Sequence, residues 1–391
     1  MQRIFLKKGR EAPILRGHPW IFSGAIETVE GDHEDICIAD ILDAERHWIA
    51  RGFFNAKSQI RVRVLTRKNE PIDGDFFSRR LSQALSLREE YLSATTNAYR
   101  LINGEGDFLP GLIVDRYNNF LVCQFFTAGM EMFKGEILSA LGSIIGIKGI
   151  FERSEGKVRD EEGLAPAVGG LAGEAPPDTI SIVENGLKFL VDVKRGQKTG
   201  FFLDQRDSRA FLSTLARGQR ILNCFSYSGG FSVYGFSGGA KSILTLDSSR
   251  PALELAEQNL ALNGFESAEG ELLKADAFAY LKETDSNFDL IVLDPPSLAP
   301  RRKDVIAATG GYKFLNLHAL RHLKPGGILL TFSCSQHLSA DLFQKVVFGA
   351  AVDAGRKVMI LRKLGHSIDH PVSLHHPEGD YLKGLALRVF D

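Results

Sequence analysis

The pattern of hydrophobic and polar residues changes about halfway along the chain. From about residue 180 onward, short apolar runs alternate with segments whose apolar positions recur at helical spacing. Such alternation is typical of a parallel sheet covered by helices. The predicted strands are Arg220–Phe225, Ser242–Leu246, Glu271–Lys274, Phe288–Leu293, Gly327–Phe332, Lys357–Leu361 and Leu385–Val389. We therefore expect residues 181–391 to form an α/β domain of the nucleotide-binding type, with a seven-stranded, mostly parallel sheet.

The first half of the chain has a different pattern, which predicts two further domains. Residues 1–72 consist of short β-like runs, and the alternation in Ile60–Leu65 places Arg61 and Arg63 on one face of a strand. Residues 73–180 begin with a predicted helix, Phe76–Tyr91, and continue with a predicted strand, Phe120–Phe126. We expect this middle domain to be α+β and to end in a mobile Gly/Ala/Pro loop at 163–177.

Composition places the chain among ordinary globular proteins. Of its 391 residues 44% are hydrophobic and 24% are charged, and the net charge is −1. The run from Arg46 to Lys68 is basic and contains neither Asp nor Glu. It forms either a solvated face or a surface that contacts phosphates.

Cysteine spacing and the hydrophobic runs predict neither a metal site nor a membrane span. The four cysteines are scattered and show no metal-ligand or disulfide spacing, and no apolar run is long enough to span a membrane. We expect no metal, no membrane partner and a cytoplasmic protein.

The first strands of the α/β region carry residues suited to an adenosine-type cofactor. Gly229 and Gly230 follow the first strand, where glycines let a ligand approach a helix N-terminus. Asp247 ends the second strand and Asp276 follows the third, so that one carboxylate reaches ribose hydroxyls and the other an exocyclic amine. Either Asp could instead cap the next helix. The glycines do not spell G-x-G-x-x-G, which disfavours a nicotinamide dinucleotide and points to S-adenosylmethionine.

Two later strands end in residues that could perform covalent chemistry. Cys334 lies between two serines at the end of one strand, and Asp294 precedes two prolines at the end of another. If these strands are neighbours, a thiol and a carboxylate lie side by side. A buried cysteine is commonly an inert small hydrophobe, but a thiol at such an edge can act as a nucleophile. Cys224, in the cofactor loop, is the rival nucleophile, and we interpret it as structural.

Motifs along nearly the whole chain resemble one family, the bacterial cytosine-5 methyltransferases of large-subunit ribosomal RNA that carry an N-terminal PUA domain. The matching segments are His18–Ala25, Lys198–Arg209, Asn223–Phe231, Asp294–Pro296, Gly311–Lys313, Ser333–Ser335, Asp369–Pro371 and Pro377–Gly384. The resemblance implies a PUA domain at 1–72 and a Rossmann-like class I methyltransferase domain at 181–391. This sequence departs from the family's pattern at Ser297, because a basic residue often follows Asp-Pro-Pro in the family.

The resemblance, together with the residues above, gives a predicted site. The predicted catalytic residues are Cys334 and Asp294. The predicted residues for binding S-adenosylmethionine are Phe202, Asp204, Gln205, Arg206, Asn223, Phe225, Ser226, Tyr227, Gly229, Gly230, Asp247, Ser248, Asp276, Ala277 and Asp294. The predicted RNA contacts are Pro295, Pro296, Tyr312, Lys313, Arg61 and Arg63.

The expected reaction forms 5-methylcytosine in 23S rRNA through a Cys334 adduct at cytosine C6. Two alternatives remain open at this stage. One is a guanine-modifying rRNA methyltransferase, whose chemistry needs no thiol, and the other is a non-catalytic RNA-binding factor of ribosome assembly. The sequence also leaves a homodimer open.

Overall fold

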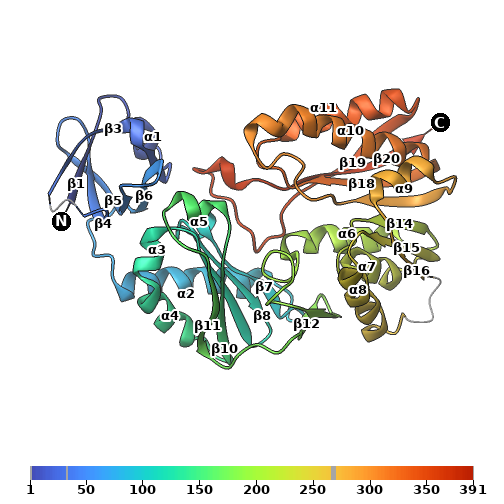
Figure 1. The fold of residues 1–391 in the computed structure, drawn as a ribbon, viewed down its shortest axis with the longest axis horizontal. Coiled ribbons are helices and arrows are strands. Elements are labelled where there is room, and N and C mark those ends of the chain that lie inside the picture. Colours follow the sequence, from blue (N-terminus) through green and yellow to red (C-terminus); the bar gives the residue numbers. More distant parts are fainter. Residues whose placement is uncertain (1, 32–33, 266–269, 391) are drawn as a thin grey trace. The chain divides into compact units, whose positions relative to one another are not determined.

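The computed structural model describes residues 2–31, 34–265 and 270–390. The chain forms two compact units (Figure 1). Unit 1 comprises Met1–Ile182, Val191–Gly200 and Ile368–Gly379, and unit 2 comprises Val183–Leu190, Phe201–Ser367 and Asp380–Asp391. The chain passes between the units within the hairpin of β12 (Ile180–Glu184) and β13 (Leu187–Val191), and again after Gly200, Ser367 and Gly379.

Unit 1 begins with a six-stranded sheet in the order β2-β6-β5-β4-β1-β3. Its strands are β1 (Gln2–Leu6), β2 (Trp20–Phe22), β3 (Ile26–Glu30), β4 (Ile36–Leu42), β5 (Trp48–Asn55) and β6 (Ile60–Thr66), with a short helix α1 (Ala12–Leu15) and a 3-10 turn η1 (Ser23–Ala25). Apolar residues on one side of this sheet, among them Ile4, Ile41 and Val62, form a small core. The predicted strand Ile60–Leu65 is thus confirmed as β6.

The same unit contains a second, five-stranded sheet in the order β11-β10-β9-β8-β7. Its strands are β7 (Ala98–Asn103), β8 (Leu112–Tyr117), β9 (Phe120–Phe125), β10 (Gly149–Ser154) and β11 (Ala167–Gly173). The helices beside it are α2 (Gly74–Tyr91), η2 (Gly104–Asp107), α3 (Ala128–Met132), α4 (Lys134–Gly142) and α5 (Lys157–Glu161), and η5 (Pro377–Gly379) also belongs to unit 1. Asp73 caps α2 by accepting a hydrogen bond from the Phe76 N–H at 3.0 Å. The predicted helix and the predicted strand at 120 are both confirmed.

The predicted mobile loop at 163–177 is wrong in its central part. Residues Ala167–Gly173 form β11, which pairs antiparallel with β10. Glycine and alanine weaken the sequence signal for a strand, but the backbone hydrogen bonds of an edge strand do not depend on side chains. The predicted domain boundaries after residues 72 and 180 stay predictions.

Unit 2 is built on a seven-stranded sheet in the order β16-β15-β14-β17-β18-β20-β19. Its strands are β14 (Arg220–Cys224), β15 (Ser242–Asp247), β16 (Gly270–Lys274), β17 (Phe288–Leu293), β18 (Leu323–Ser333), β19 (Lys357–Leu364) and β20 (Lys383–Phe390). The five strands from β16 to β18 pair in parallel, and β20 is antiparallel to both of its neighbours. Each predicted strand of this region is confirmed, and so is the predicted α/β architecture.

Helices cover both faces of this sheet (Figure 1). One face carries η3 (Leu203–Gln205), α6 (Arg206–Leu215), α7 (Gly230–Ser237) and α8 (Arg250–Leu262), and the other carries α9 (Ala277–Glu283), η4 (Arg302–Asp304), α10 (Val305–Arg321) and α11 (Ala340–Asp353). Pro251 lies in the first turn of α8, and Gly264, with φ +76°, follows its end. These layers leave the carboxyl ends of β14 to β18 at one edge of the sheet.

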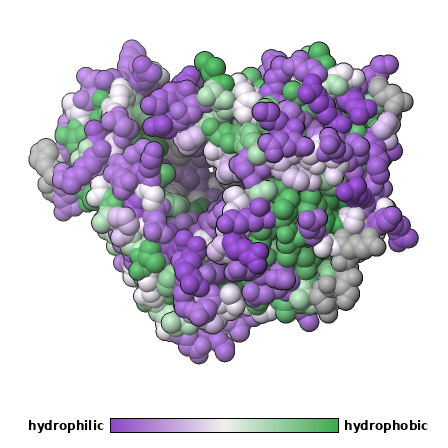
Figure 2. Space-filling view, turned by 45° about the vertical axis from the view of Figure 1, so that its right-hand side comes forward, coloured by the Kyte–Doolittle hydropathy of each residue, from purple (hydrophilic) through white to green (hydrophobic). Residues whose placement is uncertain are grey.

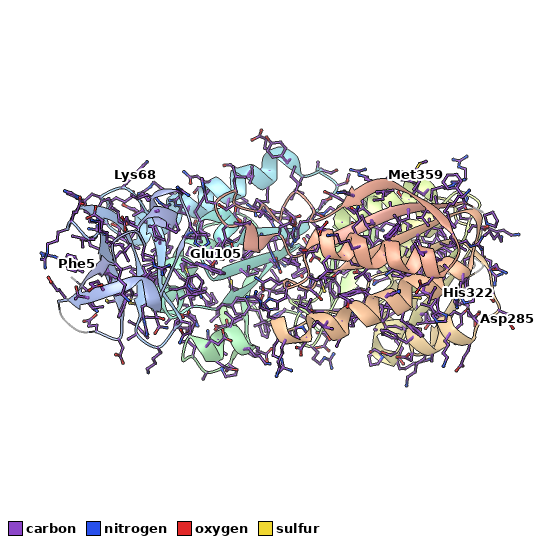
Figure 3. All side chains as sticks on the ribbon, turned by 90° about the horizontal axis from the view of Figure 1, so that it is seen from above. Phe5, Lys68, Glu105, Asp285, His322 and Met359 are labelled. Atoms are coloured by element: carbon purple, nitrogen blue, oxygen red, sulfur yellow. The ribbon has the colours of Figure 1, made fainter. Side chains whose placement is uncertain are left out.

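Hydrophilic residues cover most of the face drawn in Figure 2. Exposed hydrophobic side chains occur on α11 and β19, where Phe348 and Met359 are more than half exposed, and Met359 points outward in Figure 3. Among the described residues, no helix is long and apolar enough to cross a membrane.

Candidate active site

The site lies where β14, β15, β17 and β18 end, because parallel strands bring their carboxyl ends to one edge of the sheet. Cys224 at the end of β14 is paired with Leu246 of β15 and with Leu293 of β17. Leu293 is in turn paired with Thr331 of β18. The predicted cofactor residues therefore lie next to the predicted catalytic ones, and the prediction that the strands before Asp294 and Cys334 are neighbours is confirmed.

The loop after β14 has an unusual backbone that brings it close to β15. Phe225, Tyr227 and Gly229 all have positive φ, of 59°, 46° and 76°. The N–H of Tyr227 donates to Asp247 Oδ2 at 2.8 Å, and the N–H of Ser249 donates to Asp247 Oδ1 at 2.9 Å. Asp247 thus holds the loop in place, and each of its oxygens keeps a lone pair for a ligand hydroxyl.

Buried polar atoms around this loop fit a polar ligand. In the described part of the chain, Asn223 Oδ1, Ser226 Oγ and both amide atoms of Gln205 are buried without a hydrogen-bond partner. Gln205 is only 2% exposed. Because such groups are costly unless satisfied, a bound molecule or ordered water has to supply their partners. The residues present therefore fit an adenosine-type cofactor.

Asp276 and its neighbours occupy the next strand end. Asp276 is exposed and caps α9 through Oδ1, which accepts from the Ala279 N–H at 2.9 Å. Capping uses one oxygen and leaves Oδ2 for a ligand. Ala277 is buried, Ser248 is exposed, and the rings of Phe225 and Phe278 meet edge to face with centroids 6.3 Å apart. The capping alternative and the ligand prediction are compatible at this position.

The segment from Phe202 to Arg206 is held against the cofactor loop and against Tyr381, just before β20. The Phe202 ring packs edge to face on Tyr227, with centroids 5.4 Å apart. Asp204 Oδ2 accepts a hydrogen bond from Tyr381 Oη at 2.6 Å. Arg206 is buried with its Nε 3.6 Å from Glu184. This segment is positioned to form one wall of the cofactor site.

Cys334 follows the last residue of β18, in a setting fixed by hydroxyl groups. The Tyr312 hydroxyl is 2.9 Å from both Ser333 Oγ and Ser335 Oγ. Ser335 Oγ also accepts from the Ala299 N–H at 3.2 Å. The serines on either side of the thiol are thereby tied to α10 and to the segment after Asp294, and Cys334 remains half-buried between them.

Asp294 and its prolines lie beside the thiol. Cys334 Sγ is 3.9 Å from the carbonyl oxygen of Pro295. Asp294 is half-buried, Pro295 is buried and Pro296 is exposed. Ser297, at the position where the sequence departs from the related family, lies 3.1 Å from Ser335 through the two hydroxyls. Its side chain therefore fastens this loop to the end of β18.

Lys383 is a residue of the site that we did not predict from the sequence. It is 8% exposed, and its Nζ donates to the carbonyl oxygens of Ser335 and Tyr381, both at 2.8 Å. Burial lowers the pKa of Lys383, while the charges of Asp380 and Cys334 oppose that shift. The signal in the sequence is a lysine at the start of a mostly apolar strand, β20.

The remaining cysteines differ from Cys334. Of the four, all within the described ranges, Cys37, Cys123 and Cys224 are buried and none forms a disulfide. Burial raises the pKa of the Cys224 thiol well above its ordinary value. This supports the interpretation of Cys224 as structural.

Of the predicted RNA contacts, Tyr312 and Arg63 do not fit the structure because they are buried, while Lys313 is partly exposed and its contact stays a prediction. Tyr312 is fully buried and binds the two serines, so its ring offers no face to a base. Lys313 pairs with Asp353 at the end of α11, 2.7 Å away. Arg63 is buried and paired with Glu105 and Glu162, at 3.3 and 3.1 Å.

Arg61 differs from Arg63 in being only half-buried, and its Nη1 lies 3.5 Å from the Asn55 carbonyl oxygen. The alternation in Ile60–Leu65 correctly predicted a strand, β6. However, residues distant in sequence cover Arg63 on the face that we expected to bind RNA.

Comparison with known proteins gives matches along the whole chain. Residues 163–354 match the family model of S-adenosylmethionine-dependent methyltransferases, and residues 4–67 match that of PUA-like domains. A protein of Tolumonas auensis named ribosomal RNA large subunit methyltransferase I is 48% identical over 99% of both chains. The protein of that name from Salmonella arizonae is 45% identical over 99% of this chain and 97% of its own.

Solved structures show the same fold at lower identity. A structure from Streptococcus mutans, described as a SAM-dependent methyltransferase, aligns with a TM-score of 0.85 and 22% identity over 99% of this chain and all of its own. Another, described as a methyltransferase complexed with SAH, aligns with a TM-score of 0.87 and 23% identity over the same shares.

Proposed function

The chain belongs to the family of ribosomal RNA large subunit methyltransferase I, which combines a PUA-like domain with a methyltransferase domain, and from this premise we propose that it methylates carbon 5 of a cytosine in large-subunit rRNA. S-Adenosylmethionine is its cofactor. A cytoplasmic location, where bacterial ribosomes are built, is part of the proposal. So is the division into domains at residues 1–72, 73–180 and 181–391.

The observation that carries the cytosine assignment is the position of Cys334. Its thiol is half-buried at the end of β18, 3.9 Å from the Pro295 carbonyl, while the other three cysteines are buried. Cytosine C5 is too weak a nucleophile to accept a methyl group unaided, so its methylation needs a nucleophile that adds to the ring. Methylation of a guanine nitrogen needs no such thiol, which makes Cys334 an argument against that alternative.

The proposed chemistry begins with the Cys334 thiolate, which forms a bond to cytosine C6. The electron pair of the C5–C6 double bond moves into the ring, and C5 acquires enamine character. S-Adenosylmethionine, when bound, would supply an electrophilic methyl group: the bond from C5 to the methyl carbon would form as the methyl–sulfur bond breaks, and S-adenosylhomocysteine would leave with the electron pair of that bond. Removal of the C5 proton by a base then re-forms the double bond and expels Cys334 as the thiolate. The thiol is therefore regenerated in every cycle.

Asp294 is proposed to stabilise the negative charge that reaches cytosine N3 when the thiolate adds to C6. A protonated Asp294 carboxyl can donate to cytosine N3, which stabilises the negative charge that develops when the thiolate adds. Pro295 and Pro296 lack N–H groups and restrict the backbone that presents this carboxyl. Because the ring must reach both groups, the target cytosine has to be unpaired or rotated out of a helix.

Nucleoside mass spectrometry of rRNA tests this proposal. Large-subunit RNA from a strain lacking the gene is incubated with purified protein and S-adenosylmethionine. We expect 5-methylcytidine to form with the wild-type chain and its rate to fall by about 10³-fold or more with Cys334→Ala. Formation of a methylated guanosine instead, or full activity of Cys334→Ala, would contradict the proposal.

A further inference from the structure

Unit 1 contains a basic groove distinct from the site at Cys334. It consists of two cavities, of about 210 Å³ and about 90 Å³, that share Thr66, Arg67 and Arg80 in their walls. Lys68 and Arg79 line the larger cavity, and Phe108 lines the smaller. The end of β6, the first turns of α2 and the residue after η2 thus line two adjoining cavities.

The two shared arginines have cationic groups without a carboxylate partner. Arg67 donates to the carbonyl oxygens of Ile14 and His18, both at 3.2 Å, and Arg80 lies 3.4 Å from the carbonyl oxygen of Leu65. Within the described residues, neither guanidinium has a carboxylate at ion-pair distance. Burial lowers the pKa of both, with Glu70 opposing the shift at Arg80. Arg67 is an exposed residue and Arg80 is half-buried, and guanidinium groups without a carboxylate partner favour an anionic ligand.

The carboxylates that line the groove are already engaged. Glu70 binds Arg79 at 2.7 Å and accepts from the Thr66 hydroxyl at 2.7 Å. Glu105 accepts from Trp20 Nε1 at 2.8 Å and pairs with Arg63 at 3.3 Å, and it lies between the two sheets of the unit in Figure 3. The exposed Lys68 adds to the excess of positive charge.

An exposed aromatic ring lies at the rim of the smaller cavity. Phe108 is 53% exposed, and its φ of 59° is rare for a bulky residue. The Arg80 guanidinium lies 5.5 Å from the centre of this ring. A strained backbone that presents an apolar ring to solvent beside a guanidinium is suited to stacking a base.

We propose that this groove binds one nucleotide of single-stranded RNA, with its phosphate on Arg67, Arg80 and Lys68 and its unpaired base stacked on Phe108. The inference rests on the proposed function in that the ligand is RNA. It concerns a binding step, however, and needs no methyl transfer. Single-stranded RNA fits better than a duplex because paired bases do not expose a face for stacking.

Fluorescence anisotropy with a short single-stranded RNA, without cofactor, tests the phosphate part of the site. Each phosphate contact contributes about 0.7 to the slope of log K against log salt. Because Arg80 and Lys68 contact the same phosphate, we expect Arg80→Gln combined with Lys68→Gln to make the slope shallower by about 0.7. Arg217→Gln is the matched control, since Arg217 is an exposed arginine just before β14, at the edge of the sheet opposite Cys334. An unchanged slope in the double variant overturns the phosphate site.

The base part of the site is tested with Phe108→Ala. Loss of one stacked base is expected to weaken binding about tenfold with an unchanged salt slope, whereas Phe108→Tyr retains affinity. Equal affinity of Phe108→Ala and wild type, or equal weakening with duplex RNA, overturns the stacking assignment. Circular dichroism checks that each variant is folded. Because RNA binding is measured without methylation, a protein that binds in this way but forms no 5-methylcytidine contradicts only the proposed function.

Discussion

Among single residues, Lys383 bears most directly on the reactivity of the Cys334 thiol. Reactive cysteines are commonly found beside a cation, because positive charge favours the thiolate. The ammonium of Lys383 is anchored on the carbonyl oxygen of Ser335, the residue after Cys334. Lys383 is therefore a positioning residue that acts through Cys334, and it also links the thiol strand to Tyr381.

Replacing Lys383 with methionine should slow the alkylation of Cys334 by iodoacetamide at neutral pH. The expected decrease is about tenfold, the change in thiolate population that corresponds to about 1.4 kcal/mol. The three buried cysteines make the reaction selective for Cys334. The rate is followed by mass spectrometry of the peptide that contains Cys334.

Two companion variants separate charge from structure. Lys383→Arg keeps the positive charge and should retain most of the alkylation rate. Tyr381→Phe removes the hydroxyl that donates to Asp204 but leaves the ammonium in place, so it should not change the rate. Equal rates in Lys383→Met and wild type would show that Lys383 has only a structural role.

Single-residue predictions from sequence succeeded where position along a strand determines the environment. Cys334 and Asp294 could be placed together because both end strands that proved to be neighbours. Arg63 could not be predicted, because Glu162, which pairs with it, lies 99 residues away. Tyr312 was misplaced for a similar reason, since its contacts are with Ser333 and Ser335 of a different element.

At the scale of elements, the turn between β14 and α7 decides the shape of the cofactor site. Gly229 has φ +76°, and a Cβ atom there would lie 2.8 Å from Cβ of Ala256 in α8. Both the backbone angle and the packing of α8 therefore require glycine. This close approach also lets the loop come near Asp247, where its backbone N–H is bound.

Gly229→Ala should destabilise the protein more than Gly264→Ala does. Gly264 has the same φ of +76°, but a Cβ there meets nothing within 4 Å. The expected loss in free energy of unfolding is about 1 kcal/mol for Gly264→Ala from backbone strain alone, and about 2–4 kcal/mol for Gly229→Ala with the added clash. Urea denaturation of both variants measures the difference, and equal losses would contradict the clash.

The elements of unit 2 were predictable because buried parallel strands are continuous apolar runs separated by helices. β11 was not predictable in the same way, since its Ala/Gly composition resembles a linker. Its strand character comes from pairing with β10, a contact that no local pattern reveals.

At the scale of the whole molecule, a buried carboxylate joins the first two predicted domains into one unit. Glu162 is 3% exposed and accepts hydrogen bonds from Ser58 and Asn55 of the first sheet region, at 2.7 and 3.0 Å. It also pairs with Arg63 and accepts from the Ala128 N–H at 3.2 Å. The residues that make this joint lie far apart in the chain, so no local pattern in the sequence reveals it.

Glu162→Leu should therefore destabilise unit 1 strongly. Removing the carboxylate leaves the Arg63 charge buried with one fewer partner, at an expected cost of about 3–5 kcal/mol in the free energy of unfolding. Glu161→Leu is the matched control, because the neighbouring Glu161 is exposed and its loss should cost less than about 0.5 kcal/mol. Calorimetry of the two variants provides the comparison. Similar melting temperatures would contradict the role given to Glu162.

The central claim is that Cys334 forms a covalent bond to a cytosine, and mechanism-based trapping tests it most directly. RNA with 5-fluorocytidine at the methylated position is incubated with the protein and S-adenosylmethionine. Fluorine cannot leave as a proton does, so the adduct should persist, and a protein–RNA complex should survive denaturing electrophoresis with wild type but not with Cys334→Ala. No such complex with an RNA that the wild-type protein methylates, or a complex that still forms with Cys334→Ala, would contradict the claim.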